Sequence, residues 1–211
     1  MTQTIKKSRL ILLGIFILLL AGAVVALFVE REPTPLEFKA QMGVSIISPP
    51  ITLPDVSLTD QDGKPFSLDQ IKGRWSLFFF GYTHCPDVCP TTLANMNQLA
   101  KTPENSEINY VFVTLDPQRD TPEKLKEHVL YFNPDFIALG GDQENINRLA
   151  EAVGVIYEIE DDKGSDNYTV NHYAAILMMD PQGRLRAHIL PPHSTSKMVE
   201  VVQKIREYYG E

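Results

Sequence analysis

The amino-acid sequence predicts an α/β domain in which helices cover a central sheet. Three short apolar runs bounded by polar residues have the character of buried strands; they are residues 75–82, 108–115 and 136–139. Each run precedes a segment whose apolar residues recur at helical spacing, and this alternation is typical of a sheet with helices packed on it. Asp62-Gly63, between the β-rich residues 56–59 and 66–68, predicts an additional N-terminal β-hairpin.

The composition indicates one domain and no nucleic-acid partner. With an N-terminal apolar segment set aside, the 211-residue chain has room for a single core. The formal net charge of −8 is spread along the chain without a basic patch, which argues against nucleic-acid binding. Two cysteines are too few for a disulfide framework and lack the two further ligands of a structural zinc site. We therefore expect them to have a chemical role.

Residues 10–29 form a charge-free apolar run that predicts a transmembrane helix. At about 1.5 Å rise per residue, these 20 residues just span a hydrocarbon core of about 30 Å. The preceding residues are basic, which predicts that residues 1–9 are cytoplasmic and that the rest of the chain lies across the membrane. A cleaved signal peptide is the alternative, because the small residues 21–23 resemble a cleavage site, but the apolar run continues beyond them.

A tether is expected between this anchor and the domain. Residues 30–50 contain four prolines and lack clear periodicity, so the domain is expected to occupy residues 51–211. The N-terminal segment is too short, and too poor in Arg and Ser, for an organellar transit peptide, which favours a bacterial source. We therefore expect a single-pass protein of the bacterial inner membrane whose C-terminal domain is periplasmic or extracytoplasmic.

The two cysteines lie where the run at residues 75–82 ends and a helix begins. Pro86 and Pro90 each disfavour the α conformation in the preceding cysteine, so the helix is expected to begin at Pro90. Cys89 then lies near the N-cap, where the helix dipole and unpaired N–H groups favour a thiolate. Because the thiolate is both the nucleophile and the metal ligand, the sequence predicts a reactive sulfur.

Capping residues and apolar spacing place the later helices. Thr121-Pro122-Glu123, Asp142, and Ser194 or a neighbour are expected to begin three of them, after the helix that follows the cysteines. The residues expected to face the core are Leu93, Met96, Leu99, Ala100, Leu125, Val129, Leu130, Ile146, Leu149, Ala150, Val153, Met198, Val201, Val202, Ile205 and Tyr209.

The C-terminal part of the domain predicts a strand pair. Residues 173–179 and 185–190 are β-rich and are joined by an Asp-Pro-Gln-Gly hairpin connection. Met178 and Met179, inside the first of these strands, are expected to pack and not to bind a metal. The acidic residues 161–167 are expected to form a solvated turn.

The Cys-x-x-x-Cys pair admits two kinds of chemistry. Two thiolates four positions apart either bind a soft metal or exchange electrons as a dithiol and a disulfide. A structural disulfide is a third option for an exported chain. The spacing alone does not separate metal from redox chemistry. A nearby histidine would favour copper, because two thiolates and one imidazole form a compact three-coordinate site, whereas structural zinc requires a fourth ligand.

Five histidines are candidates for that imidazole. His84 adjoins a cysteine in an extended segment, where neighbouring side chains point to opposite faces, so it is expected to point away from a metal. His128, on an amphipathic helix, and His188, within a strand, are expected to have surface or packing roles. His193, in a loop, and His172, which opens the C-terminal strand pair after a polar loop, both remain candidates.

Three segments of the domain carry a specific pattern. They are Gly81-Tyr82-Thr83-His84-Cys85-Pro86-Asp87-Val88-Cys89-Pro90, Thr114-Leu115-Asp116-Pro117-Gln118-Arg119-Asp120-Thr121-Pro122, and Val170-Asn171-His172 followed by Asp180-Pro181-Gln182-Gly183. This pattern closely resembles the SCO/SenC family of copper chaperones, and the resemblance covers about residues 50 to 209. It implies a thioredoxin-like fold, a membrane anchor and copper binding by Cys85, Cys89 and His172, with the two cysteines as a redox-active pair.

The resemblance also implies partners. Family members deliver copper to the binuclear copper site of cytochrome c oxidase subunit II, or act on the thiols of that site. The expected partners are therefore this subunit or another cuproprotein, other copper chaperones or thiol oxidoreductases, and the membrane.

Two residues depart from the family pattern. The family often has an acidic residue where Asn171 stands and a small residue where Tyr173 stands. Because both flank His172, they can change the surroundings of that ligand and the copper affinity, but neither removes a ligand.

Three aspartates are candidates for supporting roles around the ligands. Asp87 lies between the cysteines, and Asp116 and Asp120 belong to the second motif. One of the latter two is expected to influence the metal loop or partner docking. The alternative for both is a turn cap or a salt bridge to Arg119 or a lysine.

Two other functions compete with copper delivery. A thiol-disulfide oxidoreductase, or a peroxiredoxin-like peroxidase, would use the same cysteines for turnover, although Cys-x-x-x-Cys differs from the usual Cys-x-x-Cys. A membrane-tethered binding module would not need the cysteines at all.

Overall fold

The computed structural model describes residues 14–17, 20, 42–160 and 168–210. The chain divides into two units, Met1–Thr34 and Pro35–Glu211. In the first unit, the described residues are helical. Across the described ranges, no helix has both the length and the apolar character needed to cross a membrane. Most of the predicted anchor at residues 10–29, and all of the predicted acidic turn at 161–167, lie outside the described residues.

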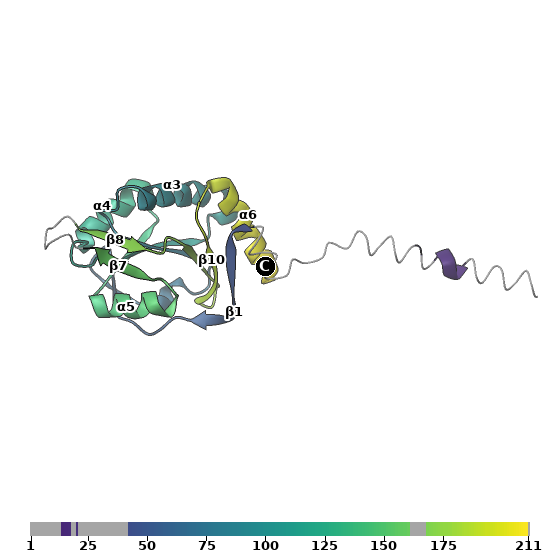
Figure 1. The fold of residues 1–211 in the computed structure, drawn as a ribbon, viewed down its shortest axis with the longest axis horizontal. Coiled ribbons are helices and arrows are strands. Elements are labelled where there is room, and N and C mark those ends of the chain that lie inside the picture. Colours follow the sequence, from purple (N-terminus) through teal and green to yellow (C-terminus); the bar gives the residue numbers. More distant parts are fainter. Residues whose placement is uncertain (1–13, 18–19, 21–41, 161–167, 211) are drawn as a thin grey trace, which may run out of the picture. The chain divides into compact units, whose positions relative to one another are not determined.

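The second unit is built on an eight-stranded sheet. In spatial order its strands are β1 (Val44–Thr52), β10 (Arg184–Ile189), β9 (Ile176–Met179), β4 (Ser76–Gly81), β5 (Asn109–Thr114), β6 (Ile137–Gly140), β2 (Leu58–Asp60) and β3 (Pro65–Phe66). β4 and β6 both run parallel to β5, and β9 runs antiparallel to β4. The three strands predicted to alternate with helices therefore lie side by side, which confirms the α/β class (Figure 1).

Helices cover both faces of this sheet, and β4 is buried between them. The helices are α3 (Val88–Ala100), α4 (Pro122–Phe132), α5 (Gln143–Ala152) and α6 (Thr195–Tyr208), with short 3-10 helices η1 (Leu68–Ile71) and η2 (Pro103–Asn105). Figure 1 shows α3 and α6 on one side of the sheet and α5 on the other. Because strand side chains alternate, Phe79 packs in one core layer and Phe78 and Phe80 in the other. The aromatic run is therefore buried on both faces, as predicted.

The predicted starts of α4, α5 and α6 and most predicted core residues are confirmed. The side chains of Thr121 and Asp142 accept hydrogen bonds from backbone N–H groups three residues later, at 3.4 and 2.7 Å, and Ser194 is the N-cap residue of α6. Leu130 was wrongly assigned to the core, since it is 45% exposed. One residue advances an α-helix by about 100°, so the position after the buried Val129 turns away from the core.

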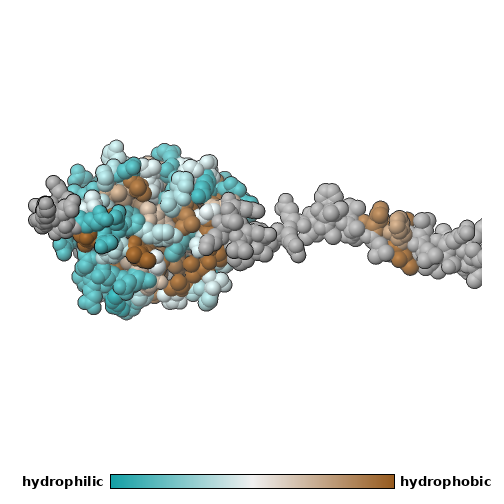
Figure 2. Space-filling model, viewed as in Figure 1, coloured by the Kyte–Doolittle hydropathy of each residue, from teal (hydrophilic) through white to brown (hydrophobic). Residues whose placement is uncertain are grey.

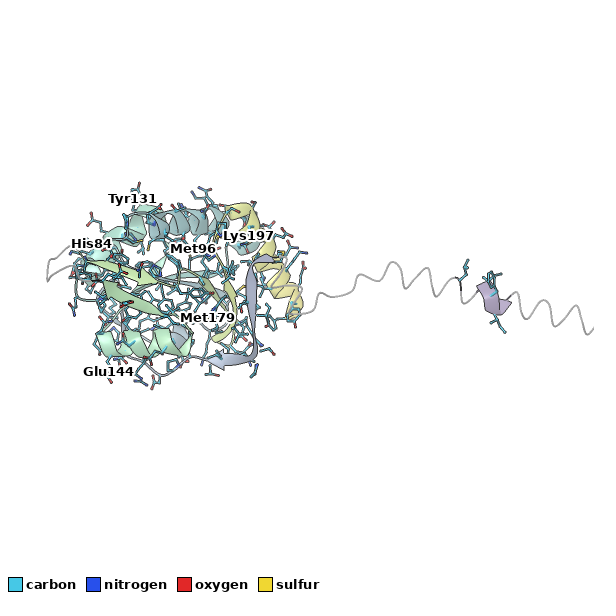
Figure 3. The ribbon with its side chains drawn as sticks, in the orientation of Figure 1. His84, Met96, Tyr131, Glu144, Met179 and Lys197 are labelled. Carbon is cyan, nitrogen blue, oxygen red and sulfur yellow. The ribbon has the colours of Figure 1, made fainter. Side chains whose placement is uncertain are left out.

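The contrast between core and surface follows the predicted pattern. In Figure 3, Met96 and Met179 lie within the domain, whereas the 84%-exposed Tyr131 points outward. Met178 and Met179 are both fully buried in β9, so they pack as predicted. Figure 2 shows apolar residues interspersed on a largely hydrophilic face of the domain.

The predicted β-hairpin is confirmed at the sheet edge. β2 pairs antiparallel with β3, with Leu58 opposite Phe66, and Gly63 in the connecting turn has a φ of 76°. This left-handed conformation favours glycine, as the Asp-Gly signal implied. β2 also pairs with β6, so the hairpin extends the sheet.

The sheet begins earlier in the chain than predicted. β1 pairs with β10 from Val44 onward, so the last residues of the expected tether at 30–50 belong to the domain, and the expected domain start at residue 51 is wrong. The prolines at positions 49 and 50 are compatible with a strand because β1 lies at the edge of the sheet, where a missing N–H donor is tolerated. The register shifts between Ile46 and Ile51, across these prolines.

His172 lies on a different element from the one predicted. β7 (Tyr157–Glu160) and β8 (Thr169–His172) form a separate antiparallel sheet, so His172 ends a strand and does not open one. The predicted strand at 173–179 shortens to β9, because the N–H of Tyr173 instead bonds to the Ile156 carbonyl at 2.9 Å and continues the β7–β8 pairing. A β-rich segment alone does not reveal which neighbour it pairs with.

Candidate metal centre

The cysteines lie between the C-terminal end of β4 and the first turn of α3. α3 begins at Val88, with Asp87 as its N-cap residue, so the predicted start at Pro90 is wrong. The first N–H groups of a helix have no partner within it, so proline in this turn removes no helical bond. Cys89 therefore lies inside the first turn, and its N–H donates to Cys85 Sγ over 3.3 Å.

The two sulfur atoms differ in exposure and in acidity. Cys85 is partly buried, Cys89 is fully buried, and both are free thiols. A hydrogen bond from the Cys89 thiol, aided by His172 and by the N–H groups of Cys89 and Asp87, lowers the pKa of Cys85 to about 4 although burial opposes this. The same hydrogen bond, together with burial, raises the pKa of Cys89. At neutral pH Cys85 is therefore the thiolate and Cys89 the thiol, so the thiolate predicted at Cys89 from its place at the helix start is wrong.

His172 approaches Cys89 from β8. Its Nε2 lies 3.8 Å from Cys89 Sγ, and its ring meets the Phe79 ring edge-on at a centroid distance of 6.1 Å. Its Nδ1 is buried and has no hydrogen-bond partner among the described residues. The imidazole thus directs one ring nitrogen at the sulfur of Cys89.

Gly81 leaves the space that the Cys89 sulfur occupies. A Cβ atom at this position would lie 2.9 Å from Cys89 Sγ and 2.9 Å from a ring carbon of Phe112, which is too close for either contact. We did not predict this role from the sequence. The available signal was a glycine at the end of an aromatic strand, because glycine in a strand often marks a close approach.

The three candidate ligands form a chain of contacts with Cys89 in the middle. Cys89 bonds to Cys85 through its backbone N–H and faces His172 through its sulfur. Within the described part of the chain, no group of three or more His, Cys, Asp or Glu side chains is already arranged around a common metal position. The chemistry of the donors nevertheless fits copper, since thiolates select Cu(I) and imidazole also binds copper well.

The other four histidines have different surroundings. His193 is 6% exposed, with Nε2 3.0 Å from the Ile189 carbonyl and Nδ1 3.4 Å from Thr92 Oγ1. Both of its ring nitrogens are occupied, which argues against the alternative ligand left open by the sequence. His128 packs against aromatic rings, His188 packs beside another, and burial lowers the pKa of both. Their predicted packing roles are therefore confirmed.

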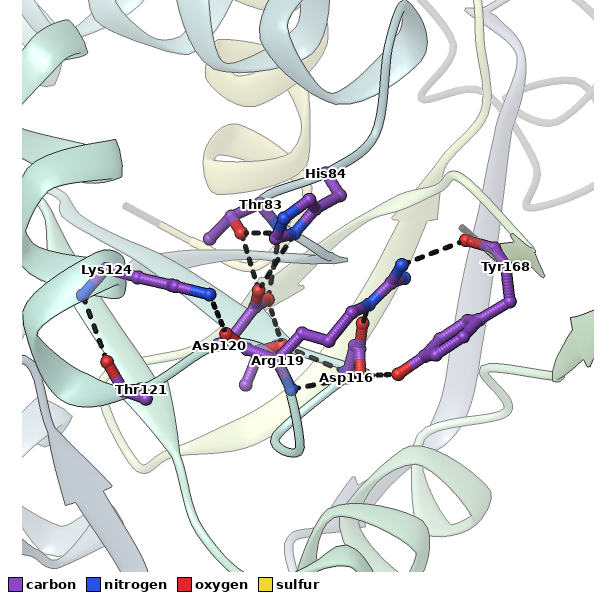
Figure 4. Close-up of polar contacts among 9 residues, drawn as sticks. Thr83, His84, Asp116, Arg119, Asp120, Thr121, Lys124 and Tyr168 are labelled. Carbon is purple, nitrogen blue, oxygen red and sulfur yellow. Dashed lines mark hydrogen bonds and ion pairs between the residues drawn. The ribbon is translucent and has the colours of Figure 1, made fainter. Parts of the chain in front are cut away.

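Asp120, in the loop between β5 and α4, lies close to His84 on the loop that leads to the cysteines. His84 Nδ1 lies 3.1 Å from Thr83 Oγ1 and 3.8 Å from Asp120 Oδ1 (Figure 4). Buried Asp120 accepts hydrogen bonds from the N–H and hydroxyl of Thr83, at 3.0 and 2.5 Å, and from the Thr114 hydroxyl at 2.6 Å. This carboxylate therefore fastens the loop two residues before Cys85 to the end of β5. Thr83 was a residue that the sequence motif contained but that we did not single out.

Asp116 lies in a second part of the same network. It is 1% exposed, forms an ion pair with Arg119 and accepts a hydrogen bond from the Tyr168 hydroxyl at 2.6 Å. The salt bridge to Arg119, one of the two alternatives for this residue, is therefore confirmed. Asp87 contributes through its backbone N–H to Cys85, and its side chain makes no capping hydrogen bond.

The two residues that depart from the family pattern point outward from the cysteines. Asn171 is exposed and donates to Glu160 Oε1 at 2.5 Å. Tyr173 is 38% exposed, and its ring centroid lies 5.9 Å from that of His188. Neither side chain occupies the space between His172 and Cys89.

Comparison with known proteins places this site in a family. The chain matches the SCO1/SenC family over residues 47–207. It is 35% identical over 208 residues to a Stutzerimonas stutzeri protein whose name describes copper binding, and the match covers 96% of both chains.

Solved structures agree with this match. The structures of ScoI with copper bound, from Arabidopsis thaliana and Bradyrhizobium japonicum, are 30% and 32% identical to this chain. Each match covers 74% of this chain and 99% of the other, with TM-scores of 0.67 and 0.64. These neighbours confirm the thioredoxin-like fold, and both of their structures hold copper. The chain belongs to the SCO1/SenC family.

Proposed function

We propose that this chain is a copper chaperone that binds copper through Cys85, Cys89 and His172. The observation that carries the proposal is the convergence of an ionised thiol, a second thiol and an imidazole at one end of β4. Membership of a family with copper-bound structures supports it.

Each ligand has a distinct part in this binding. Cys85 is partly exposed and is a thiolate at neutral pH, so it is the first sulfur able to meet an incoming ion. Cys89 must release its proton to bind, because a metal ligates the deprotonated form. His172 supplies the nitrogen donor that distinguishes this site from a simple dithiol.

We further propose that the protein is anchored in the bacterial inner membrane and supplies copper to cytochrome c oxidase subunit II. The charge-free run at residues 10–29 supports the anchor. The partial exposure of Cys85 supports transfer, since a cargo ion must be reachable by the thiolates of a client.

Metal analysis after anaerobic loading with Cu(I) or Cu(II) tests the proposal. We expect about one equivalent of copper to remain bound after desalting, and Cu(II) binding to produce a sulfur-to-copper charge-transfer absorption. Retention of less than half an equivalent would contradict the proposal. The matched control is Cys85→Ser with Cys89→Ser, which should retain none.

A thiol-disulfide oxidoreductase is the second candidate function. It is favoured by the opposite pKa shifts of the two cysteines. The low-pKa Cys85 thiolate attacks a client disulfide and releases one client thiolate, and Cys89 then attacks the mixed disulfide, which releases the client as a dithiol and leaves a Cys85–Cys89 disulfide. Steady reduction of a disulfide or peroxide substrate by the metal-free protein, with an added dithiol as the reductant that regenerates the cysteines, would support this activity. Stoichiometric reaction without turnover would oppose it.

A further inference from the structure

The strand that carries His172 is held to the rest of the domain mainly by side chains. Among the described residues, the β7–β8 sheet shares no hydrogen-bond ladder with the eight-stranded sheet. Along β8 and the residue before it, burial alternates: Thr169 and Asn171 are exposed, whereas Tyr168, Val170 and His172 are wholly or partly buried. Because alternate residues of a strand share a face, Tyr168 and His172 lie at opposite ends of the same inward face.

Tyr168 is clasped by the Asp116–Arg119 pair (Figure 4). The Arg119 guanidinium lies 3.4 Å from the centroid of the Tyr168 ring, and Arg119 Nη1 donates to the Tyr168 carbonyl at 3.1 Å. The Tyr168 hydroxyl donates to Asp116 Oδ1 at 2.6 Å. Burial and the Asp116 carboxylate raise the pKa of Tyr168 to about 12, so the hydroxyl remains a donor at neutral pH.

The loop between β5 and α4, which carries Asp116 and Arg119, also contacts the segment that carries the cysteines. Asp116 and Asp120 are four residues apart, and Asp120 binds Thr83, two residues before Cys85. The Arg119 guanidinium also lies 5.8 Å from the ring of Tyr82, on the cysteine loop. One loop therefore contacts both the segment that carries the cysteines and the strand that carries His172.

We propose that Tyr168 is a positioning residue for His172: clasped by Arg119 and Asp116, it sets how the end of β8 presents the imidazole to Cys89. The proposal rests on the copper function proposed above. β8 has four residues, rises about 13 Å and is fastened to the loop after β5 by Tyr168, the residue before it. Because β8 is paired only with β7, loss of the clasp lets the two-stranded sheet, and His172 with it, shift relative to the cysteines. The cysteine pair itself does not depend on this clasp, because it is linked within its own loop.

The experiment compares full-length wild type with Tyr168→Leu and Tyr168→Phe, and with Tyr131→Leu as the matched control on the exposed face of α4. Copper ions are the probe. We expect Tyr168→Leu to bind Cu(II) roughly tenfold more weakly, the change that about 1.4 kcal/mol produces, with altered charge-transfer absorption and a smaller loss of Cu(I). Tyr168→Phe keeps the ring beneath Arg119 and should recover part of the loss. Tyr131→Leu should match wild type.

A copper-free measurement separates positioning from binding. In the metal-free protein the His172 ring packs against the Phe79 ring in a T-shaped arrangement, so the Phe79 ring current makes the NMR shifts of the His172 ring protons report the position of the imidazole. These shifts should change in Tyr168→Leu and remain at the wild-type values in Tyr131→Leu. If wild type takes up no copper, the proposed function fails, and the shifts still decide whether Tyr168 positions His172.

Several outcomes would overturn the proposal. Wild-type Cu(II) affinity, absorption and His172 shifts in Tyr168→Leu would do so directly. Equal losses of Cu(I) and Cu(II) with unchanged His172 shifts would also overturn it, because they indicate a general effect on the domain. If Tyr168→Leu does not fold, Tyr168→Phe decides, and wild-type shifts and affinity in that variant refute the role.

Discussion

Replacing Gly81 with alanine tests whether the Cys89 sulfur is seated against the β4 backbone. The added Cβ would lie 2.9 Å from both Cys89 Sγ and a Phe112 ring carbon, and ordinary contacts begin near 3.4 Å, so each neighbour must move by about 0.5 Å. Both neighbours are buried. Overpacking of this kind costs about 1–3 kcal/mol, and for a domain of this size each kcal/mol lowers Tm by about 2–4 °C. We expect Gly81→Ala to lower Tm by about 2–12 °C and to weaken copper binding.

Gly140→Ala provides the matched control for that variant. Its Cβ would meet the end of the Leu125 side chain at 3.3 Å and the Thr114 methyl group at 3.6 Å, with neither cysteine within 4 Å. We expect a smaller change in Tm and unchanged copper affinity. Thermal unfolding followed by circular dichroism, and copper competition titrations, measure both quantities. If Gly81→Ala loses less than about 0.5 kcal/mol and binds copper as wild type does, the inferred packing of the Cys89 sulfur is wrong.

Three further predictions concern the centre. His172→Ala should change the free energy of unfolding by about 1 kcal/mol or less and should still allow a disulfide to form between Cys85 and Cys89. The variant should lose the charge-transfer absorption of bound Cu(II) more completely than it loses Cu(I) binding. An unchanged Cu(II) spectrum would show that another residue supplies the nitrogen. Alkylation of Cys85 by iodoacetamide should be nearly as fast at pH 6 as at pH 8, because its pKa of about 4 leaves it ionised at both pH values. The alkylation of an ordinary thiol would slow roughly 75-fold between pH 8 and pH 6. A slowing of that size for Cys85 would contradict the assigned thiolate. Asp120→Ala leaves the buried Thr114 hydroxyl and the partly buried donors of Thr83 without their acceptor. The variant should lose about 2–4 kcal/mol of unfolding free energy, measured by urea unfolding, and a loss below about 1 kcal/mol would argue against the role of Asp120 in fastening the loop.

The main errors of sequence reasoning fell where pairing partners matter. Apolar periodicity located β4, β5, β6 and the four helices, because burial of one face leaves a local pattern. It did not locate the start of β1, since the prolines there are disfavoured in a central strand and acceptable at an edge. It also placed His172 on the wrong strand, because the choice between pairing with β7 and extending β9 depends on distant residues.

The functional residues could be found from the sequence, but the contacts between them could not. Cys85 and Cys89 were evident from their spacing after a buried strand, and the motif resemblance singled out His172. The links that organise these residues were not evident. Asp120 to Thr83 spans 37 positions, and Tyr168 to Asp116 spans 52. No local pattern reports such contacts. The first arises because the parallel strands β4 and β5 bring their carboxyl ends together, and the second because the start of β8, in a separate sheet, packs against the loop that follows β5.

The sequence by itself determined the four helices, the central strands of the sheet and which side chains are capable of copper chemistry. Helix caps, strand composition and the cysteine spacing act within a few residues, so their consequences can be read locally. The tertiary structure alone decided that Cys85 is the thiolate and Cys89 the thiol, since this split depends on the hydrogen bond between the two side chains, on the deeper burial of Cys89 and on the neighbouring imidazole from β8. It also decided how His172 reaches the cysteines. His172 and Cys89 are 83 positions apart in the chain, and only the packing of β8 against the rest of the domain brings them into contact.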